Sequence, residues 1–242
     1  DTGNVREENQ DFYRMERLGP ETLLAVVCDG MGGARAGNVA SRLACEVFCG
    51  EVCRSLRDGM TEAEEQDVLC TAAKLANISV YEHAQLSEEF RGMGTTLVGA
   101  FVQGGSASIM NVGDSRAYIM SGGMLHQISE DHSYVEEMRR LGRISEADAR
   151  SHPQKNLITR AVGVDATVEG DLFEQTLADG DILLLCSDGL TGMVEDGKIA
   201  EVLAGAGTLE DKGRELLTLA LEGGGRDNIT VALFTCGAKQ EA

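Results

Sequence analysis

The sequence has few basic residues, no long apolar run and no tryptophan. It carries 21 Lys and Arg against 40 Asp and Glu, a formal charge of −19, which argues against a nucleic-acid backbone or an anionic membrane as the main partner. No apolar run approaches the roughly 18 residues of a membrane-spanning helix, and no signal peptide is visible. Hydrophobic residues still make up 43% of the chain, which excludes a disordered protein. Only two prolines occur, whereas 30 glycines predict many tight turns.

The seven cysteines lack the dense, regular spacing of a secreted disulfide framework. We therefore expect a reducing compartment, and the cytoplasm is the predicted location. Cys45, Cys49 and Cys53 are four residues apart and would lie on one face of a helix. They could be zinc ligands, but no CxxC pair supports that hypothesis. The favoured interpretation is that they are small apolar residues of a buried stripe.

A length of 242 residues is enough for one large domain with a sizeable core. We expect residues 1–242 to form a single catalytic domain and a monomer. Because the chain begins with Asp1 rather than methionine, we also expect it to be a fragment of a longer protein.

Apolar periodicity divides the chain into helical and strand-like stretches. Spacings of three and four residues predict helices at about 37–56, 61–85, 196–203 and 209–221. Short apolar runs between glycine-rich separators predict strands at 95–102, 107–112, 116–120, 125–128, 168–177, 181–186 and 229–234. This order favours an α+β core of two sheets flanked by helices.

Residues 133–165 interrupt this pattern and are interpreted as an insertion. They contain six Lys or Arg against five acids, a balance less acidic than that of the whole chain. Such a stretch is typical of a solvated helical surface, and the alternative is a flap that contacts an acidic or phosphorylated substrate.

Two apolar runs end in the dipeptide Asp-Gly. Residues 23–28 lead into Asp29-Gly30, and residues 182–187 lead into Asp188-Gly189. Asp-Gly can simply form a hairpin turn. The alternative is that a carboxylate at the end of a rigid strand is held in place for a metal or phosphate site.

Other acids occupy comparable positions. Asp114 follows the strand-like run 109–113, Asp227 precedes the run 229–234, and Asp11 lies near the N-terminus. Carboxylates that converge on one edge of a sheet would repel one another, so such a cluster implies bound cations.

Seven short motifs follow one another along the chain: Val5-Arg6-Glu7-Glu8-Asn9-Gln10-Asp11, Asp29-Gly30-Met31-Gly32-Gly33, Gly94-Thr95-Thr96-Leu97, Val112-Gly113-Asp114-Ser115-Arg116, Asp131-His132-Ser133, Ser187-Asp188-Gly189-Leu190 and Asp227-Asn228-Ile229-Thr230. In this order they resemble the motifs of the metal-dependent protein phosphatases of type 2C, the PPM family, in their bacterial form. The resemblance implies a four-layer α/β/β/α sandwich of two mainly antiparallel sheets flanked by helix pairs, with a flap subdomain at about 133–165. It also implies hydrolysis of phosphoserine and phosphothreonine by direct attack of a metal-bridging water or hydroxide.

The resemblance assigns most of the metal ligands. It implies that Asp29 bridges two catalytic ions and that the carbonyl of Gly30 binds one of them. Asp188 and Asp227 would complete the protein ligands of the other ion.

Three further positions match the family, and two depart from it. Asp11 would support the cluster through bound water, Asp114 would share a third, weaker ion with Asp188, and Arg6 would bind phosphate. The family often has an acid where this chain has Gln10, so we expect weaker binding of the second ion. Some eukaryotic relatives have a proton-donating histidine where this chain has Met31, so we expect a metal-bound water to protonate the leaving group.

The chemistry of phosphoester hydrolysis agrees with these roles. Two divalent ions roughly 3.5–4 Å apart lower the pKa of a bridging water and neutralise charge on the phosphoryl group. Ligands that are all oxygen indicate Mn²⁺ or Mg²⁺ rather than zinc. The planar guanidinium of Arg6 can hold two phosphate oxygens. Gly30, Gly32 and Gly33 would let the backbone approach the ions closely.

Alternative functions remain at this level. A pseudophosphatase, acting as a binding or regulatory module, would lack a metal acid, and none is missing. An aspartyl-phosphate phosphatase would need its nucleophile in a DxD motif, whereas Asp29 is followed by Gly30-Met31. Calcium storage would need an EF-hand loop, and none occurs. We expect phosphorylated proteins as substrates, among them a serine/threonine kinase or its targets. The histidines are interpreted as structural: His83, His126, His132 and His152.

Overall fold

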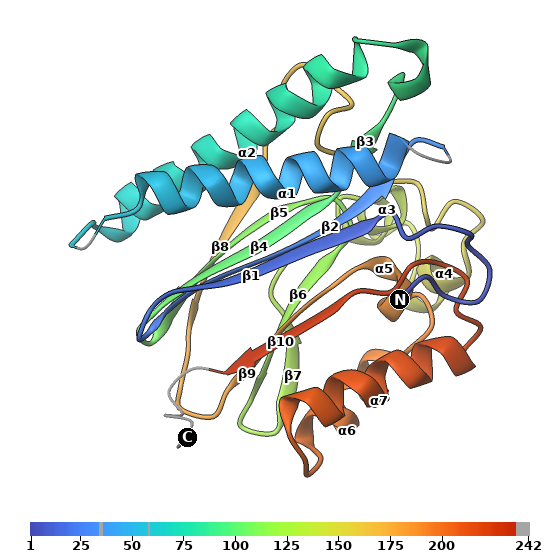
Figure 1. The fold of residues 1–242 in the computed structure, drawn as a ribbon. Coiled ribbons are helices and arrows are strands. Elements are labelled where there is room, and N and C mark those ends of the chain that lie inside the picture. The colour runs from blue at the N-terminus through green and yellow to red at the C-terminus, as the bar shows by residue number, and fades with distance from the viewer. Residues whose placement is uncertain (34–35, 58, 236–242) are drawn as a thin grey trace.

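The computed structural model describes residues 1–33, 36–57 and 59–235. Two antiparallel sheets form its centre (Figure 1). The first contains the strands β1 (Asp11–Gly19), β2 (Thr22–Met31), β4 (Leu97–Gln103), β5 (Ser106–Val112) and β8 (Asp171–Thr176), in the order β1-β2-β4-β5-β8, with the short β3 (Gly94–Thr95) paired to β2. The second contains β6 (Arg116–Ser121), β7 (Met124–Gln127), β9 (Ile182–Cys186) and β10 (Val231–Thr235), in the order β10-β9-β6-β7.

A helix pair covers the outer face of each sheet (Figure 1). The helices α1 (Ala36–Ser55) and α2 (Glu62–Ala84) pack on the first sheet, and the 3₁₀ turn η1 (Glu88–Phe90) follows them. The helices α6 (Asp196–Ala204) and α7 (Leu209–Glu222) pack on the second sheet. Three apolar clusters fill the spaces between these layers. The predicted α/β/β/α sandwich is therefore confirmed.

The continuous apolar runs of the sequence belong to strands that are covered on both faces. In β2, Leu24 and Val26 face the helix pair, whereas Ala25 and Val27 face the other sheet. Successive side chains of a strand point to opposite faces, so a strand buried on both sides needs an unbroken apolar run.

Most predicted elements occur, but some bounds differ. The helix α2 begins after the capping box of Thr61 and Glu64, as the sequence predicts. The last strand begins two residues later than predicted. Its expected first residues bond elsewhere, because Ile229 N–H donates to the Asp1 carbonyl and Thr230 N–H donates to Ser187 Oγ.

The insertion at 133–165 contains two short helices, α3 (Tyr134–Arg140) and α4 (Glu146–Ser151). Ser133 and Ser145 cap their N-termini by accepting backbone N–H bonds. None of the helices in the described ranges is long and apolar enough to cross a membrane.

The helical cysteines agree in part with the buried-stripe interpretation. Cys45 and Cys49 are buried against the first sheet, but Cys53 is exposed at the end of the stripe. No group of three His, Cys, Asp or Glu residues among those described could hold a metal ion by itself, so the zinc hypothesis has no support. The seventh cysteine, Cys236, lies outside the described residues.

The end of α6 depends on a buried lysine of α7. Lys212 is only 6% exposed, and its Nζ donates to the carbonyls of Leu203, at 2.6 Å, and of Gly205. These are the orphan carbonyls that every helix C-terminus leaves.

Replacing Lys212 with methionine is expected to lower the free energy of unfolding by about 2 kcal/mol, because the stem is kept but buried carbonyls lose their donor. For a chain of this size the melting temperature should fall by roughly 4–8 °C. Lys198→Met is the matched control, since Lys198 is on α6 but pairs with Glu201 at the surface, where such a pair contributes less than about 1 kcal/mol. Equal melting temperatures for the two variants would contradict this role of Lys212.

Candidate active site

The acids singled out in the sequence gather at one end of the two sheets. Asp29 lies at the end of β2, Asp114 in the turn between β5 and β6, and Asp227 in the loop before β10. Asp188 begins the short helix α5 (Asp188–Thr191), which directly follows β9 and was not predicted. These four line one pocket of about 460 Å³, together with Arg6, Gly30, Asn156 and Ile158.

Asp11 lies behind this pocket, directly opposite Asp29 in the register of β1 and β2. Its Oδ2 accepts hydrogen bonds from Ser187 Oγ and Thr230 Oγ1, both at 2.7 Å. Its Oδ1 is buried and has no hydrogen-bond partner. Burial raises the pKa of Asp11, although the two hydroxyl donors oppose that change. A buried carboxylate oxygen without a donor is costly unless a cation or water satisfies it.

The backbone around Asp29 is fixed by two threonines. Its N–H donates to Thr96 Oγ1 at 2.9 Å, and its carbonyl accepts from Thr95 Oγ1, also at 2.9 Å. Burial raises the pKa of the Asp29 carboxyl well above its ordinary value, and the charges of Asp11 and Asp188 raise it further. The strand end therefore holds a carboxylate that needs positive charge to remain ionised.

Two more carboxyls share this electrostatic environment. Burial raises the pKa of Asp188 to about 6, and the charge of Asp227 adds to the effect. Burial and the charge of Asp188 raise the pKa of Asp114 to about 8. Perturbed carboxyls that raise one another's pKa are typical of sites that bind metal ions or perform acid-base chemistry.

The structure gives steric and conformational reasons for the glycines after Asp29. A Cβ on Gly30 would lie 2.1 Å from the carbonyl oxygen of Gly37, at the start of α1, so a side chain there would collide with that helix. Gly32 and Gly33 have φ angles of 126° and 87°, which only glycine adopts readily. Close packing at Gly30 and turn geometry at Gly32 and Gly33 therefore require glycine at these positions.

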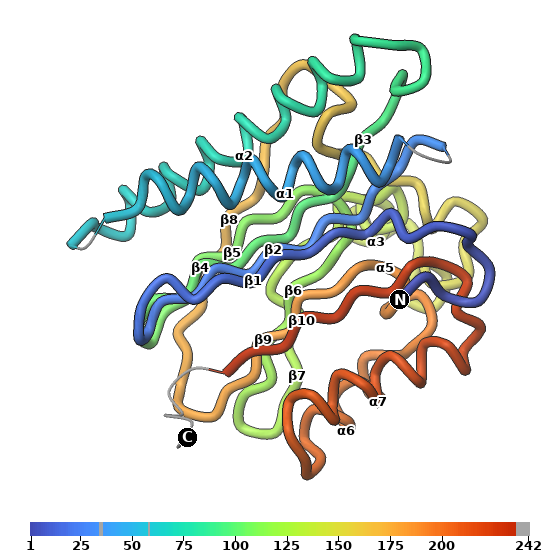
Figure 2. The backbone as a smooth tube through the Cα atoms, viewed as in Figure 1, coloured from blue at the N-terminus to red at the C-terminus, as the bar shows by residue number. Residues whose placement is uncertain are grey.

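Arg6 reaches the pocket from the N-terminal segment. Its Nη2 donates to Asp227 Oδ2 at 2.7 Å, and its side chain is half exposed. The segment itself is bound to the loop before β10, where Asn228 Nδ2 donates to the carbonyls of Thr2 and Glu8 and Asn228 Oδ1 accepts from Gln10 N–H. Figure 2 shows these two stretches running side by side.

Asn228, Thr96 and Ser187 were given no role from the sequence. Each lies inside a quoted motif, and Asn228 and Ser187 are next to an acid, which is the signal that could have identified those two. Their side chains are buried and bond to neighbouring chain segments.

The arrangement suits hard divalent ions that keep much of their water. The donors are carboxylates and carbonyls, and Asp11 offers an oxygen without a partner. No three His, Cys, Asp or Glu side chains of the described ranges converge as the complete ligand set of one ion. Mg²⁺ and Mn²⁺ in phosphoryl-transfer sites commonly take only one or two carboxylates and several waters, so an open pocket fits them better than a closed cage.

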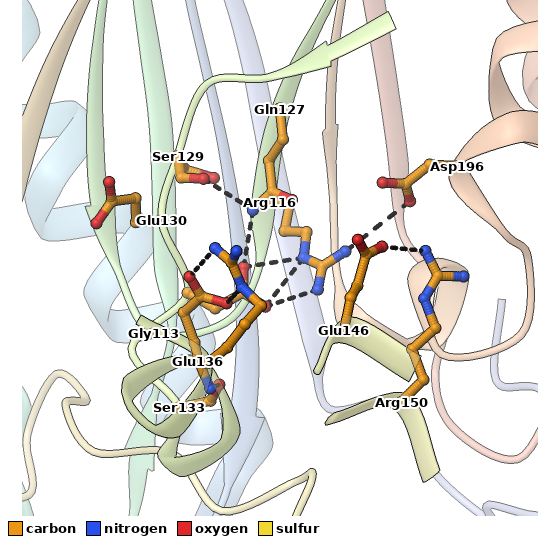
Figure 3. A network of polar contacts seen from close by, with 12 residues as sticks. Gly113, Arg116, Gln127, Ser129, Glu130, Ser133, Glu136, Glu146, Arg150 and Asp196 are labelled. Atoms are coloured by element: carbon orange, nitrogen blue, oxygen red, sulfur yellow. Dashed lines mark hydrogen bonds and ion pairs between the residues drawn. The ribbon is translucent and has the colours of Figure 1, made fainter. Parts of the chain in front are cut away.

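A second groove of about 650 Å³ continues from the pocket along the segment 133–156. The two share Asp114, Asn156 and Asp188. Figure 3 shows a wall of this groove, where Arg116 extends toward Asp196 and Arg150 pairs with Glu146.

Comparison with known proteins agrees with this geometry. The family described as Protein phosphatase 2C matches residues 4–219. The chain belongs to that family. A serine/threonine phosphatase of Listeria monocytogenes is 40% identical over 233 residues, which cover 96% of this chain and 92% of the relative. Protein phosphatase PhpP of Streptococcus pneumoniae is 36% identical over 237 residues, covering 97% and 94%.

Solved structures of type 2C phosphatases have the same fold. The serine/threonine phosphatase Stp1 of Staphylococcus aureus matches with a TM-score of 0.90 and 38% identity, over 98% of this chain and 93% of the other. The Mycobacterium tuberculosis phosphatase PstP/Ppp matches with a TM-score of 0.84 and 34% identity, over 98% and 96%. The predicted family and serine/threonine phosphatase activity are confirmed, and the pseudophosphatase alternative finds no support. The type 2C family is metal-dependent.

Proposed function

We propose that this protein serine/threonine phosphatase removes phosphate from phosphoserine and phosphothreonine at the pocket formed by Asp29, Asp188, Asp227 and Arg6. Two Mn²⁺ or Mg²⁺ ions, when bound, would supply positive charge for the phosphoryl oxygens and acidify a water. The observation that supports this best is the half-buried Asp29 carboxylate, which lines the pocket and whose pKa is raised by partial burial and by four neighbouring acids. Such a group is stable as an anion only beside cations.

Each residue around the pocket would have a separate task. Asp29 would lie between the two ions, the Gly30 carbonyl would bind one of them, and Asp188 and Asp227 would bind the other. Asp11 would orient water through its free Oδ1. Asp114 would hold a third, weaker ion together with Asp188.

Arg6 would bind and align the phosphate. Its guanidinium has five N–H donors in a fixed plane, and Asp227 holds it at the pocket from one side. Met31 also lines the pocket and cannot donate a proton, so the leaving group would take its proton from water.

The wider assignments rest on the same resemblance. Residues 1–242 would form one catalytic domain, acting as a monomer in the cytoplasm. Its flap, residues 133–165, would contact phosphorylated protein substrates, among them a serine/threonine kinase or its targets. The flap residues Asn156 and Ile158, which line the pocket, support this placement.

The direct test is hydrolysis of p-nitrophenyl phosphate and of a phosphothreonine peptide with Mn²⁺, with Mg²⁺ and with chelator. We expect turnover with Mn²⁺ and none with chelator. An absence of metal-dependent hydrolysis of any phosphoester by folded protein would refute the proposal.

Replacing Arg6 with alanine is expected to raise the KM for a phosphothreonine peptide by about 10- to 100-fold, because a charge-assisted hydrogen bond contributes roughly 1.5–3 kcal/mol. Arg6→Lys should recover only part of this, since lysine lacks the planar fork. Arg91→Ala is a suitable control, because Arg91 pairs with Glu88 at the surface. Steady-state kinetics at saturating Mn²⁺ measure the effect, and an unchanged KM in Arg6→Ala would contradict it.

A further inference from the structure

We propose that His132 is a positioning residue for Asp114: its imidazole and backbone hold the turn that carries this acid at the edge of the pocket. The inference rests on the proposed function, because it takes Asp114 as a metal ligand. His132 was interpreted from the sequence only as a structural histidine. It is buried, at 5% exposure, and does not itself line the pocket.

His132 forms hydrogen bonds with both the backbone N–H and the backbone carbonyl of Gly113, the residue before Asp114. Its backbone N–H donates to the Gly113 carbonyl at 2.9 Å, and its Nδ1 accepts from Gly113 N–H at 3.1 Å. Gly113 has a φ of 109°, and a Cβ there would lie 2.7 Å from the Thr96 side chain. The turn therefore packs closely against Thr96 on one side and forms hydrogen bonds with His132 on the other.

The bond from Gly113 fixes the tautomer of the imidazole. Because Nδ1 accepts, the proton of the neutral ring is on Nε2. Nε2 therefore donates to Asp171 Oδ2 at 3.0 Å, and Arg160 donates to the other oxygen of Asp171 at 2.8 Å. The Asp171 carboxylate thereby fixes the orientation of the imidazole ring, as hydrogen-bond partners fix the orientation of metal-binding histidines.

Asp131, the residue before His132, binds the other side of the same turn. Asp131 accepts from Nε and Nη2 of Arg116, at distances of 2.7 to 3.0 Å. Arg116 follows Asp114 by two residues, and Figure 3 shows its guanidinium at the centre of a polar network. The consecutive residues Asp131 and His132 therefore bind the chain on both sides of Asp114: His132 binds Gly113, and Asp131 binds Arg116.

Asp29 is tied to the turn by a separate route. Ser115 Oγ and Thr96 Oγ1 lie 2.7 Å apart, and Thr96 Oγ1 accepts the N–H of Asp29. These bonds do not involve His132. Loss of the imidazole is therefore expected to affect the site at Asp114 more than the site at Asp29.

Two substitutions separate this role from simple packing. His132→Asn places an amide oxygen near the position of Nδ1, so the bond from Gly113 is kept and the bond to Asp171 is lost. His132→Gln places its amide near the position of Nε2, so the Gly113 bond is lost instead. A residue that only fills the core would give similar effects in both variants.

The experiment measures Mn²⁺ binding by calorimetry in the wild type, both His132 variants and Asp114→Asn. Asp114→Asn identifies the binding event that depends on Asp114. We expect His132→Gln to weaken that event about tenfold, as supporting residues of metal sites typically do, and His132→Asn to weaken it less than threefold. His152→Gln is the matched control, because it removes a similar bond, from Gln154 N–H to the half-buried imidazole of His152, which lies outside the pocket.

A second measurement does not depend on metal. Amide hydrogen exchange of Gly113, followed by NMR in chelator, should become at least tenfold faster in His132→Gln and remain near the wild-type rate in His132→Asn. Equal effects of the two variants, or none in His132→Gln, would overturn the positioning role. If Asp114→Asn changes no Mn²⁺ binding event, Asp114 is not a metal ligand. The proposal that His132 positions a ligand then fails as well, even if the exchange rate of Gly113 shows that His132 holds the turn.

Discussion

Replacing Asp29 with asparagine is expected to lower kcat/KM for phosphothreonine peptides on the order of 10³-fold. The carboxylate is proposed to lie between both ions, and metal-ion stabilisation of a phosphoryl transition state contributes several kcal/mol. The same change should make the chelated protein more stable, because it removes one of the buried carboxyls whose charges oppose one another. Steady-state kinetics with Mn²⁺ and thermal unfolding with chelator measure the two effects.

Asp67→Asn is the matched control for this experiment. Asp67 lies on α2 and is exposed. The activity and the melting temperature of Asp67→Asn should therefore equal those of the wild type. Activity of Asp29→Asn within tenfold of the wild type would exclude a bridging role for Asp29. A lower melting temperature of the variant in chelator would instead contradict the electrostatic account.

Without divalent ions, stability is expected to fall as pH rises from about 4 to above 8. The pKa of Asp188 is raised to about 6 and that of Asp114 to about 8, both from an ordinary 3.8, chiefly by burial. The folded state therefore binds more protons than the unfolded state in this range, and stability is lost as pH rises through each folded-state pKa. A rise of about two units in one group corresponds to on the order of 3 kcal/mol.

Thermal unfolding in chelator at pH 5 and pH 8.5 measures this effect. The melting temperature is expected to be roughly 6–12 °C lower at pH 8.5, which corresponds to about 3 kcal/mol. Saturating Mn²⁺ should abolish the fall, since cations replace the protons on the carboxylates. Asp114→Asn in chelator should show a smaller pH dependence than the wild type. Equal melting temperatures of the chelated wild type at both pH values would refute the linkage.

The sequence predicted the elements with a strong periodic signal. The helix that follows Thr61 was predicted with both its cap and its length, because the capping box and the apolar spacing agree. The strand β1 was not predicted. It lies at the edge of its sheet with residues such as Tyr13 and Met15 exposed, so it lacks the unbroken apolar run that marks the doubly covered β2.

The four acids that line the pocket could be predicted as a set, because Asp29, Asp114, Asp188 and Asp227 each follow or precede an apolar run. Their partners could not. Asn228 binds the N-terminal segment about 220 residues away, and His132 binds Gly113 across 19 residues. Such bonds depend on how the two sheets are placed, which local periodicity does not encode. The short helix α5 was missed for the related reason that four residues carry no periodic signal.

The pairing of the N-terminal segment with the loop before β10 has a consequence for the time at which activity arises. During synthesis Arg6 and Asp29 emerge early, whereas Asp227 and Asn228 emerge after nearly all of the described chain. Contacts between such distant segments form slowly, because a long loop must close first. A nascent or partly unfolded chain therefore lacks the complete pocket. If phosphate binds at this pocket as proposed, activity is expected to begin only when both ends of the fold have come together.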